Sequence, residues 1–178
     1  MLAGDQDGFR VRCEVTVNSQ KFMDYIDILV KPYWAPRAAS RFLELVREKY
    51  YDGVAFNRVV PKLMTQFGIA KDHAVRMKEK ELTIWDDFPK DMKFEPGTIS
   101  FSAQGHDSRS SEVFIVMPGT PKEELEKLGQ NSWETPFAVI DGDVTQSALT
   151  KIYSGYGDAK GELAVEVTSL STPVLLMI

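Results

Sequence analysis

Apolar and polar residues alternate near the start of the chain in a pattern that predicts a β-hairpin. Every second residue is apolar from Phe9 to Val17, and the alternation returns from Ile26 to Val30 after a turn at Asn18-Ser19-Gln20. A period of two places alternate side chains on one face of the backbone, as in a half-buried strand. We expect these two segments to pair as antiparallel strands.

Two later segments show helical spacing instead. From Ala38 to Tyr50 apolar side chains recur at every third or fourth position, and Pro36 just before them suits the first turn of a helix. The turn residues Tyr51-Asp52-Gly53 are expected to end this helix. A second helix is predicted over Val144 to Ile152, where apolar residues stand four positions apart.

Short apolar runs separated by turn residues predict further strands, over residues 54–60, 63–68, 99–103, 113–117 and 137–140. Residues 70–96 are the least regular part, and the run from Lys78 to Glu81 within them is interpreted as a solvated charged face. Many short strands with two helices far apart in sequence are typical of a closed or nearly closed antiparallel barrel. We predict a single mainly β domain over residues 1–178.

The composition is that of an ordinary globular protein, with 43% hydrophobic and 26% charged residues. The net charge of −5 and the lack of a long Lys/Arg cluster argue against a nucleic-acid partner. No run of about 18 apolar residues is present, so no membrane partner is expected either.

Cysteine and histidine are scarce. Cys13 stands alone and is interpreted as a small buried side chain, which is compatible with the cytoplasm or another reducing compartment. Residues 1–9 lack the basic start and apolar core of a signal peptide, although a leader removed upstream is compatible with the sequence. His73 and His106 have no neighbouring Cys or His to complete a ligand set, so no metal is expected.

One segment carries a specific motif, from Tyr51 to Gly68. It contains an aromatic start, an arginine, a Val-Pro pair, a methionine and a Gln-x-Gly ending, at Tyr51, Arg58, Val60-Pro61, Met64 and Gln66-Phe67-Gly68. This segment resembles the cyclophilin signature, and residues 96–105 with 110–115 resemble its second half. The resemblance extends from about Val11 to Gly157. It implies a closed antiparallel cyclophilin-like β-barrel of about eight strands with two α-helices covering its ends.

The resemblance also implies a reaction, rotation about an X-Pro peptide bond. The barrier is about 20 kcal/mol because amide resonance must be broken, and lowering it needs no nucleophile, metal or cofactor. A hydrogen-bond donor aimed at the proline and an apolar socket for its ring suffice. Arg58 matches the family's catalytic arginine. Gln66 matches the side chain that binds the substrate backbone and orients that arginine.

The other matched positions form the substrate site. The resemblance places the proline socket at Leu63, Met64 and Phe114, and the strand that pairs with the peptide backbone at Ser102 and Ala103. Taken one at a time, the apolar residues of this set would be ordinary core residues, and an isolated arginine an ion-pair partner. Their common spacing is what assigns them to a site.

This chain departs from the family pattern at several positions. Leu63 stands where phenylalanine is usual, Ser102 where alanine is usual, and Ala103 where asparagine is usual. The groove tryptophan and histidine have no secure counterpart within residues 118–135, where Leu128 or Trp133 are the candidates to fill that side. Trp85 and Trp133 are otherwise interpreted as packing residues. The lost contacts predict reduced activity.

Two functions remain open on these observations. The first is a peptidyl-prolyl cis-trans isomerase acting on X-Pro bonds of proteins or peptides. The alternative is a non-catalytic proline-peptide-binding or scaffold module within a larger assembly. Toward the C-terminus, Leu163 to Val167 is expected to form a strand beside the first one. The apolar run Val174, Leu175, Leu176, Met177 and Ile178 is expected either to pack on the barrel or to dock a protein partner.

Overall fold

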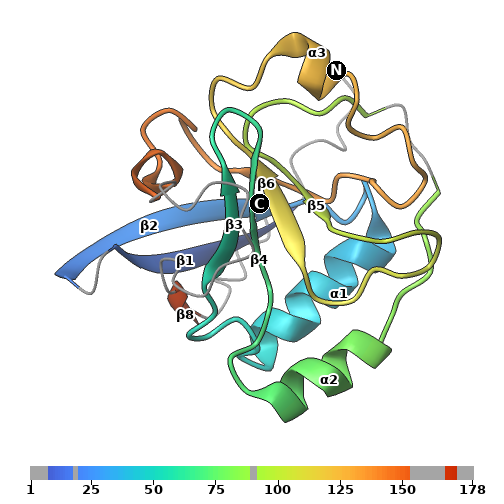
Figure 1. Ribbon diagram of the computed structural model, residues 1–178, viewed down its shortest axis with the longest axis horizontal. Helices are drawn as coiled ribbons and strands as arrows, with labels where there is room; N and C mark the ends of the chain where they lie inside the picture. Colours follow the sequence, from blue (N-terminus) through green and yellow to red (C-terminus); the bar gives the residue numbers. More distant parts are fainter. Residues whose placement is uncertain (1–7, 18–19, 89–91, 153–166, 172–178) are drawn as a thin grey trace.

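The structure, a computed structural model, describes residues 8–17, 20–88, 92–152 and 167–171. These residues form a curled antiparallel sheet in which the long β1–β2 hairpin runs across the β3–β4 hairpin (Figure 1). None of the helices in these ranges combines the length and the apolar character needed to cross a bilayer.

The sheet has eight strands, and every pairing between neighbours is antiparallel. The strands are β1 (Phe9–Val17), β2 (Gln20–Val30), β3 (Phe56–Val60), β4 (Met64–Phe67), β5 (Thr98–Phe101), β6 (Val113–Val116), β7 (Ala138–Ile140) and β8 (Val167–Ser171). Their order is β3-β4-β6-β5-β7-β2-β1-β8. The mainly β class predicted from the sequence is confirmed. Among the described residues no pairing joins β3 to β8, so full closure of the barrel stays a prediction.

The predicted opening hairpin is confirmed, and its register pairs apolar positions of the two strands. Val11 pairs with Ile28 and Cys13 with Ile26, and all four side chains are buried on the same face. This follows from the period of two, which turns alternate residues of both strands toward the core. Burial raises the pKa of the Cys13 thiol and keeps it in the neutral form.

The chain returns beside β1 at its C-terminal end, as expected. The strand that pairs there is β8, with Cys13 opposite Leu170, and it begins at Val167 rather than ending there. The remainder of the predicted strand, residues 163–166, and the apolar run at residues 174–178 lie outside the described residues.

The first predicted helix is α1 (Pro36–Arg47). Its Ala38, Phe42 and Leu45 side chains are buried, as the helical spacing indicates. The side chain that caps its N-terminus comes from far along the sequence. The Asp87 carboxylate accepts hydrogen bonds from the backbone N–H of Arg37 at 2.9 Å and of Ala38 at 3.0 Å. This contact attaches the segment that follows the next helix to α1.

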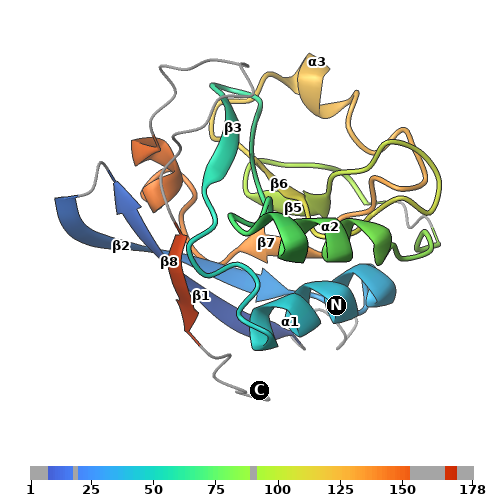
Figure 2. The same ribbon diagram turned by 60° about the horizontal axis from the view of Figure 1, so that its bottom comes forward.

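That next helix, α2 (His73–Glu81), was not predicted. It begins at Asp72, whose side chain accepts a hydrogen bond from the Val75 N–H at 3.0 Å. The expectation of a solvated charged run at residues 78–81 is wrong at Glu79, which is 3% exposed. Glu79 Oε2 lies 2.5 Å from Arg41 Nη2 and thereby joins α2 to α1, which lie side by side in Figure 2.

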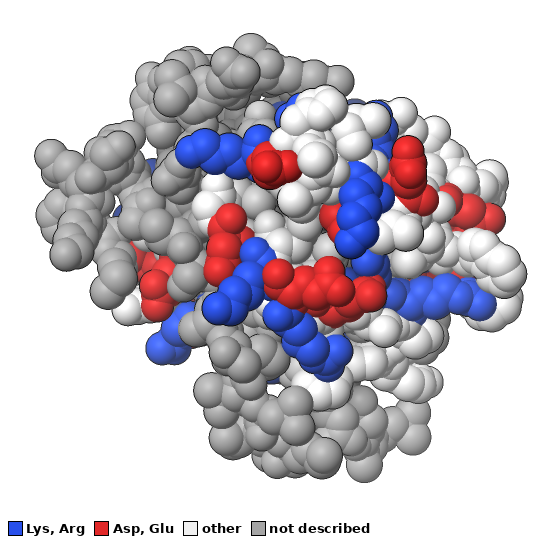
Figure 3. Space-filling model, turned by 90° about the horizontal axis from the view of Figure 1, so that it is seen from below, with Lys and Arg blue, Asp and Glu red and all other residues white. Residues whose placement is uncertain are grey.

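The other charged side chains of α1 and α2 themselves are exposed. Figure 3 shows acidic and basic side chains interleaved on the face seen from below, without a continuous basic strip in the coloured part. This arrangement favours local ion pairing on that face.

The second predicted α-helix, over residues 144–152, is wrong. Only a 3₁₀ turn forms there, η1 (Ala148–Lys151), and the other short helix is α3 (Lys122–Leu125). Side chains before η1 bond to the nearby backbone: Asp143 accepts from the Thr145 N–H at 2.9 Å, and the Ser147 hydroxyl donates to the Val144 carbonyl at 2.8 Å. Such local bonds compete with the i to i+4 ladder of an α-helix.

Two apolar clusters lie on opposite faces of β6. The main core contains Val113 and Ile115 together with Phe42, Phe101 and Phe137. Phe114 and Val116 point the other way and form a smaller cluster with Phe94. Alternation along β6 thus places Phe114 outside the main core, on the face that carries the candidate site.

Candidate functional site

The β3–β4 hairpin brings three of the candidate residues together. Arg58 pairs with Gln66 in the strand register, so their side chains share a face of the sheet. Arg58 Nη1 lies 3.4 Å from Gln66 Oε1 and 3.7 Å from Met64 Sδ. Arg58 as a whole is partly exposed.

Gln66 also connects this hairpin to β5 and β6. It pairs with Phe114 in the β4–β6 register, and its Nε2 donates a hydrogen bond to Ser102 Oγ at 3.0 Å. Ser102 directly follows β5, and its backbone N–H donates to the Glu112 carbonyl at 2.8 Å. Ala103 is the next residue and is partly buried. The structure therefore places Gln66 between Arg58 and Ser102, with Phe114 on the neighbouring strand.

Phe114 is the centre of the smaller apolar cluster. It is 4% exposed, and its ring stacks on that of Phe94 with centroids 5.9 Å apart and planes 14° apart. Partly buried Met64, Leu125 and Leu128 pack against this cluster. Leu128, one of the two residues expected to fill the groove, thus contacts the cluster that contains Phe114.

Trp133, the other candidate, packs elsewhere. Its ring stands edge-on to His106, with centroids 4.9 Å apart. Phe94 was not predicted for this site. It stands in the irregular stretch before β5, where no period assigns it to a face. Its place in the site is identified by the stacking of its ring on that of Phe114.

Leu63 lies in the turn between β3 and β4, one residue before Met64. Its carbonyl accepts hydrogen bonds from the Met117 N–H at 3.0 Å and from Thr120 Oγ1 at 3.2 Å. These bonds tie the turn to the end of β6. The partly buried side chain is shorter than the phenylalanine that the resemblance leads one to expect.

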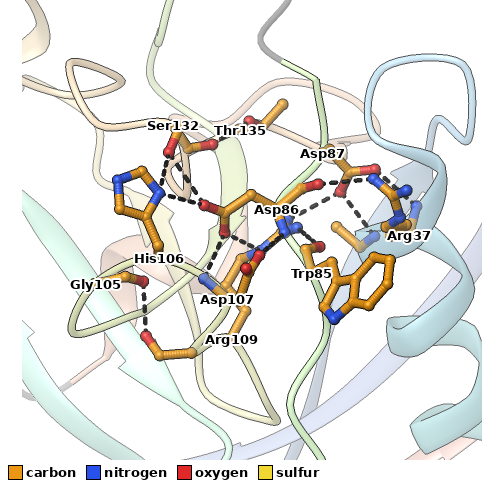
Figure 4. Close-up of polar contacts among 12 residues, drawn as sticks. Arg37, Trp85, Asp86, Asp87, Gly105, His106, Asp107, Arg109, Ser132 and Thr135 are labelled. Carbon is orange, nitrogen blue, oxygen red and sulfur yellow. Dashed lines mark hydrogen bonds and ion pairs between the residues drawn. The ribbon is translucent and has the colours of Figure 1, made fainter.

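A polar network supports the connection between β5 and β6, which carries Ser102 and Ala103 (Figure 4). Its centre is Arg109, which is fully buried and donates to Asp87 at 3.0 Å and to the Trp85 carbonyl at 2.5 Å. Asp87 caps α1 at the same time. Arg109 therefore holds the β5–β6 connection against the segment that is attached to α1.

The same network contains an aspartate, a histidine and a serine in contact. His106 Nδ1 lies 3.0 Å from both Asp86 Oδ2 and Ser132 Oγ, and Ser132 donates to Asp86 at 3.1 Å. Both partners meet the same ring nitrogen, so the histidine does not stand between them as in a nucleophilic triad. The three groups form a closed triangle that fixes the loop containing His106.

Asp86 is the carboxylic acid of this triangle. Burial works against its ionisation. Hydrogen bonds from His106, from the Asp107 N–H and from Ser132, with the nearby charge of Arg109, outweigh that effect and lower its pKa. Asp86 is therefore ionised at neutral pH and strengthens the network that holds the loop.

A separate shallow groove of about 560 Å³ lies between α1 and the segment after α2, lined by Pro36, Arg37, Ser40, Arg41, Glu44, Ile84 and Trp85. The interpretation of Trp85 as a packing residue is wrong, since the side chain is 72% exposed. Its backbone carbonyl accepts a hydrogen bond from Arg109. None of these lining residues belongs to the cluster around Arg58. In the described part of the chain no group of three His, Cys, Asp or Glu side chains is arranged to hold a metal ion.

In chemical terms the site offers a fixed cationic donor beside an amide and an apolar wall. A guanidinium carries only hydrogen-bond donors, so Arg58 can donate hydrogen bonds to a substrate but offers no acceptor. This arrangement suits recognition of a carbonyl next to an apolar ring. It is not suited to bond cleavage by proton abstraction.

Comparison with known proteins gives a consistent result. The family described as "Cyclophilin type peptidyl-prolyl cis-trans isomerase/CLD" matches residues 13–167. The crystal structure of a Cryptosporidium parvum cyclophilin type peptidyl-prolyl cis-trans isomerase matches with a TM-score of 0.66 at 19% identity, covering 92% of this chain and 96% of that one. At 19% identity this structural match shows similarity of fold alone.

Sequence relatives are longer than this chain. A Streptococcus pyogenes serotype M6 protein, assigned as a bifunctional phosphatase/peptidyl-prolyl cis-trans isomerase, is 28% identical over 147 residues, which are 80% of this chain and 31% of that protein. A Staphylococcus epidermidis protein assigned as a peptidyl-prolyl cis-trans isomerase is 28% identical over 117 residues, 63% of this chain and 58% of that protein. The family match extends over most of the sequence, and the chain therefore belongs to the cyclophilin-type peptidyl-prolyl cis-trans isomerase family.

Proposed function

We propose that this chain catalyses cis-trans isomerisation of X-Pro peptide bonds in proline-containing peptides and proteins. The observation that carries the proposal is the position of the Arg58 guanidinium, which contacts Gln66 and Met64 on the face of the sheet that also bears Phe114. An apolar ring and a peptide carbonyl next to each other are the features that this combination of groups can bind together.

Arg58 has the main chemical role in this proposal. Twisting the X-Pro bond removes the amide resonance, which leaves the proline nitrogen pyramidal and able to accept a hydrogen bond. A guanidinium that donates to this nitrogen or to the prolyl carbonyl stabilises the twisted state more than the planar one, and this difference lowers the barrier. The donor is therefore needed at the transition state rather than for folding.

The remaining residues hold the substrate. Met64 and Phe114 offer the apolar surface for the proline ring, with Leu63 in the adjoining turn. Gln66 orients Arg58 and has an amide that can bond the substrate backbone. Ser102 and Ala103, at the end of β5, present backbone groups to an extended peptide. We expect lower activity than in a protein with phenylalanine at this position, because Leu63 has no aromatic ring to contact the proline.

The alternative of a non-catalytic proline-peptide-binding module has one specific observation in its favour. The Phe114 side chain is only 4% exposed because Phe94 stacks on it, so part of its surface is already covered. A module that binds proline-containing peptides and releases them slowly could keep this arrangement without accelerating isomerisation.

The experiment is an isomerisation assay on a panel of X-Pro peptides, monitored by NMR exchange or by coupled proteolysis. Wild-type protein should exceed the uncatalysed rate, and Arg58→Ala should lower kcat/KM about 100-fold with folding intact, as for loss of one transition-state donor. Arg76→Ala is the control, because Arg76 is exposed on α2. A wild type that binds the peptides without accelerating their isomerisation would support the binding module instead.

A protein partner for the apolar run at residues 174–178 is a further part of the proposal, supported by its composition. Deleting these residues should reduce association with the partner or a second copy while leaving thermal stability unchanged. Lower thermal stability of the monomer would show that the run packs on the domain instead.

A further inference from the structure

The Gln66 side chain has two ends of opposite hydrogen-bonding character. Its carbonyl oxygen accepts, and its NH₂ group donates. Oε1 faces Arg58 Nη1 at 3.4 Å, and Nε2 donates to Ser102 Oγ at 3.0 Å. A guanidinium has only hydrogen-bond donors, so it is stabilised when the acceptor Oε1 of Gln66 faces it. If the amide were rotated so that the NH₂ group faced Arg58, two donors would oppose each other.

Gln66 is 8% exposed, so its amide has little access to solvent. A buried NH₂ group without an acceptor is unfavourable. The Ser102 hydroxyl supplies that acceptor. Without it, the amide gains by rotating toward other acceptors or toward solvent, and Oε1 then leaves Arg58.

The Ser102 hydroxyl is itself held in place. The Ser102 N–H donates to the Glu112 carbonyl at 2.8 Å, directly before β6 begins. In the sheet order β4-β6-β5, the side-chain bond from Gln66 to Ser102 therefore spans β6 and links its two neighbours. This bond fixes the distance between the Gln66 amide and the end of β5.

We propose that Ser102 is a positioning residue, whose hydroxyl holds the Gln66 amide so that Oε1 stays on Arg58. The inference rests on the proposed isomerase function and adds to it a hydroxyl at a position where the resembling family commonly has alanine. The Ser102 hydroxyl acts through Gln66 and does not itself need to touch the reacting bond.

The test compares Ser102→Ala, Ser102→Thr and Ser100→Ala in the full chain. Ser102→Ala should lower kcat/KM about fivefold, the effect of one neutral hydrogen bond. Ser102→Thr keeps the hydroxyl and should restore most of the loss. Ser100→Ala is the matched control, because Ser100 is a buried serine on β5 whose hydroxyl donates to the Thr135 carbonyl at 3.0 Å rather than serving as an acceptor for Gln66.

Two further measurements separate positioning from a general structural effect. Combined with Gln66→Ala, the Ser102→Ala change should have no additional effect on kcat/KM, because the amide through which it acts is gone. The Gln66 side-chain NH₂ protons should exchange faster with solvent in Ser102→Ala than in wild type, and Ser100→Ala should leave their exchange unchanged.

The outcomes distinguish this inference from the proposed function. Two outcomes would overturn the inference and leave the isomerase function standing. The first is an active wild type whose kcat/KM equals that of Ser102→Ala. The second is a loss of kcat/KM from Ser102→Ala that is the same with and without Gln66. A wild type without isomerase activity would overturn the proposed function, and the positioning role of Ser102 in it.

Discussion

The Phe94 ring stacks on Phe114, with 5.9 Å between centroids and 14° between planes. Both side chains are 4% exposed, and Gly129 makes room for the pair, since a Cβ there would lie 2.8 Å from Phe94 Cε2. Gly129 also has φ +76°, a conformation that glycine adopts without strain. Phe94 therefore supplies an aromatic wall to the cluster that contains Phe114 and is contacted by Met64, the residue after Leu63.

Removing this wall should affect stability. We expect Phe94→Ala to lower the free energy of unfolding by about 3 kcal/mol, because a buried ring is replaced by a cavity. Phe88→Ala is the control, with the same change at a side chain that is 79% exposed, and should stay within about 1 kcal/mol of wild type. Urea unfolding measures both. Equal losses in the two variants would mean that Phe94 is not packed as described.

Adding an aromatic side chain at the turn should strengthen binding. Leu63→Phe restores the residue type of the family pattern next to Met64, and we expect about fivefold tighter binding of an X-Pro peptide from added contact with the proline ring. Calorimetric titration against wild type measures the change. Leu82→Phe, at an exposed leucine, should leave the affinity unchanged. Unchanged or weaker binding by Leu63→Phe would place the proline socket elsewhere.

The buried ion pair between Arg41 and Glu79 should matter for α2. Their side chains are 6% and 4% exposed, so removing Glu79 leaves Arg41 buried with Glu44, at 2.9 Å, as its remaining acidic partner. Because Glu44 stays in place, we expect Glu79→Ala to lower the free energy of unfolding by about 3 kcal/mol, the lower end for a broken buried pair, and to speed hydrogen exchange in α2. Glu81→Ala, at an exposed position of the same helix, is the control. Slow exchange in α2 of Glu79→Ala would show that the pair does not hold the helix.

The Asp86 network predicts a dependence of stability on pH. Hydrogen bonds lower the pKa of Asp86 in the folded protein below its value of about 3.9 in the unfolded chain. Its contribution is therefore fully present above the unfolded pKa and is lost as the pH falls through the lower folded pKa.

Asp86→Asn should accordingly unfold more easily than wild type at neutral pH. The difference in unfolding free energy should shrink as the pH drops below about 4, which urea unfolding across that range measures. A difference that stays constant down to about pH 2 would show that the aspartate acts through its shape rather than its charge.

The sequence by itself determined the elements in which apolar side chains mark a buried face. Alternation from Phe9 to Val17 predicted the opening hairpin, and helical spacing after Pro36 predicted α1. The signature around Arg58 predicted that Arg58, Met64 and Gln66 share a site, and strand pairing brings these three side chains into contact.

Only the tertiary structure decided the features that depend on a partner far along the chain. The α2 helix has no apolar stripe because its one buried residue is Glu79, whose partner Arg41 is 38 positions away. Phe94 belongs to an irregular segment, so no periodicity assigns its side chain to a buried face. Its ring is identified as part of the apolar cluster by its stacking on Phe114. Periodicity reports burial through apolar side chains, so a buried charge or a single aromatic in an irregular segment leaves no such mark. These residues are identified by what packs against them, which is a property of the folded chain.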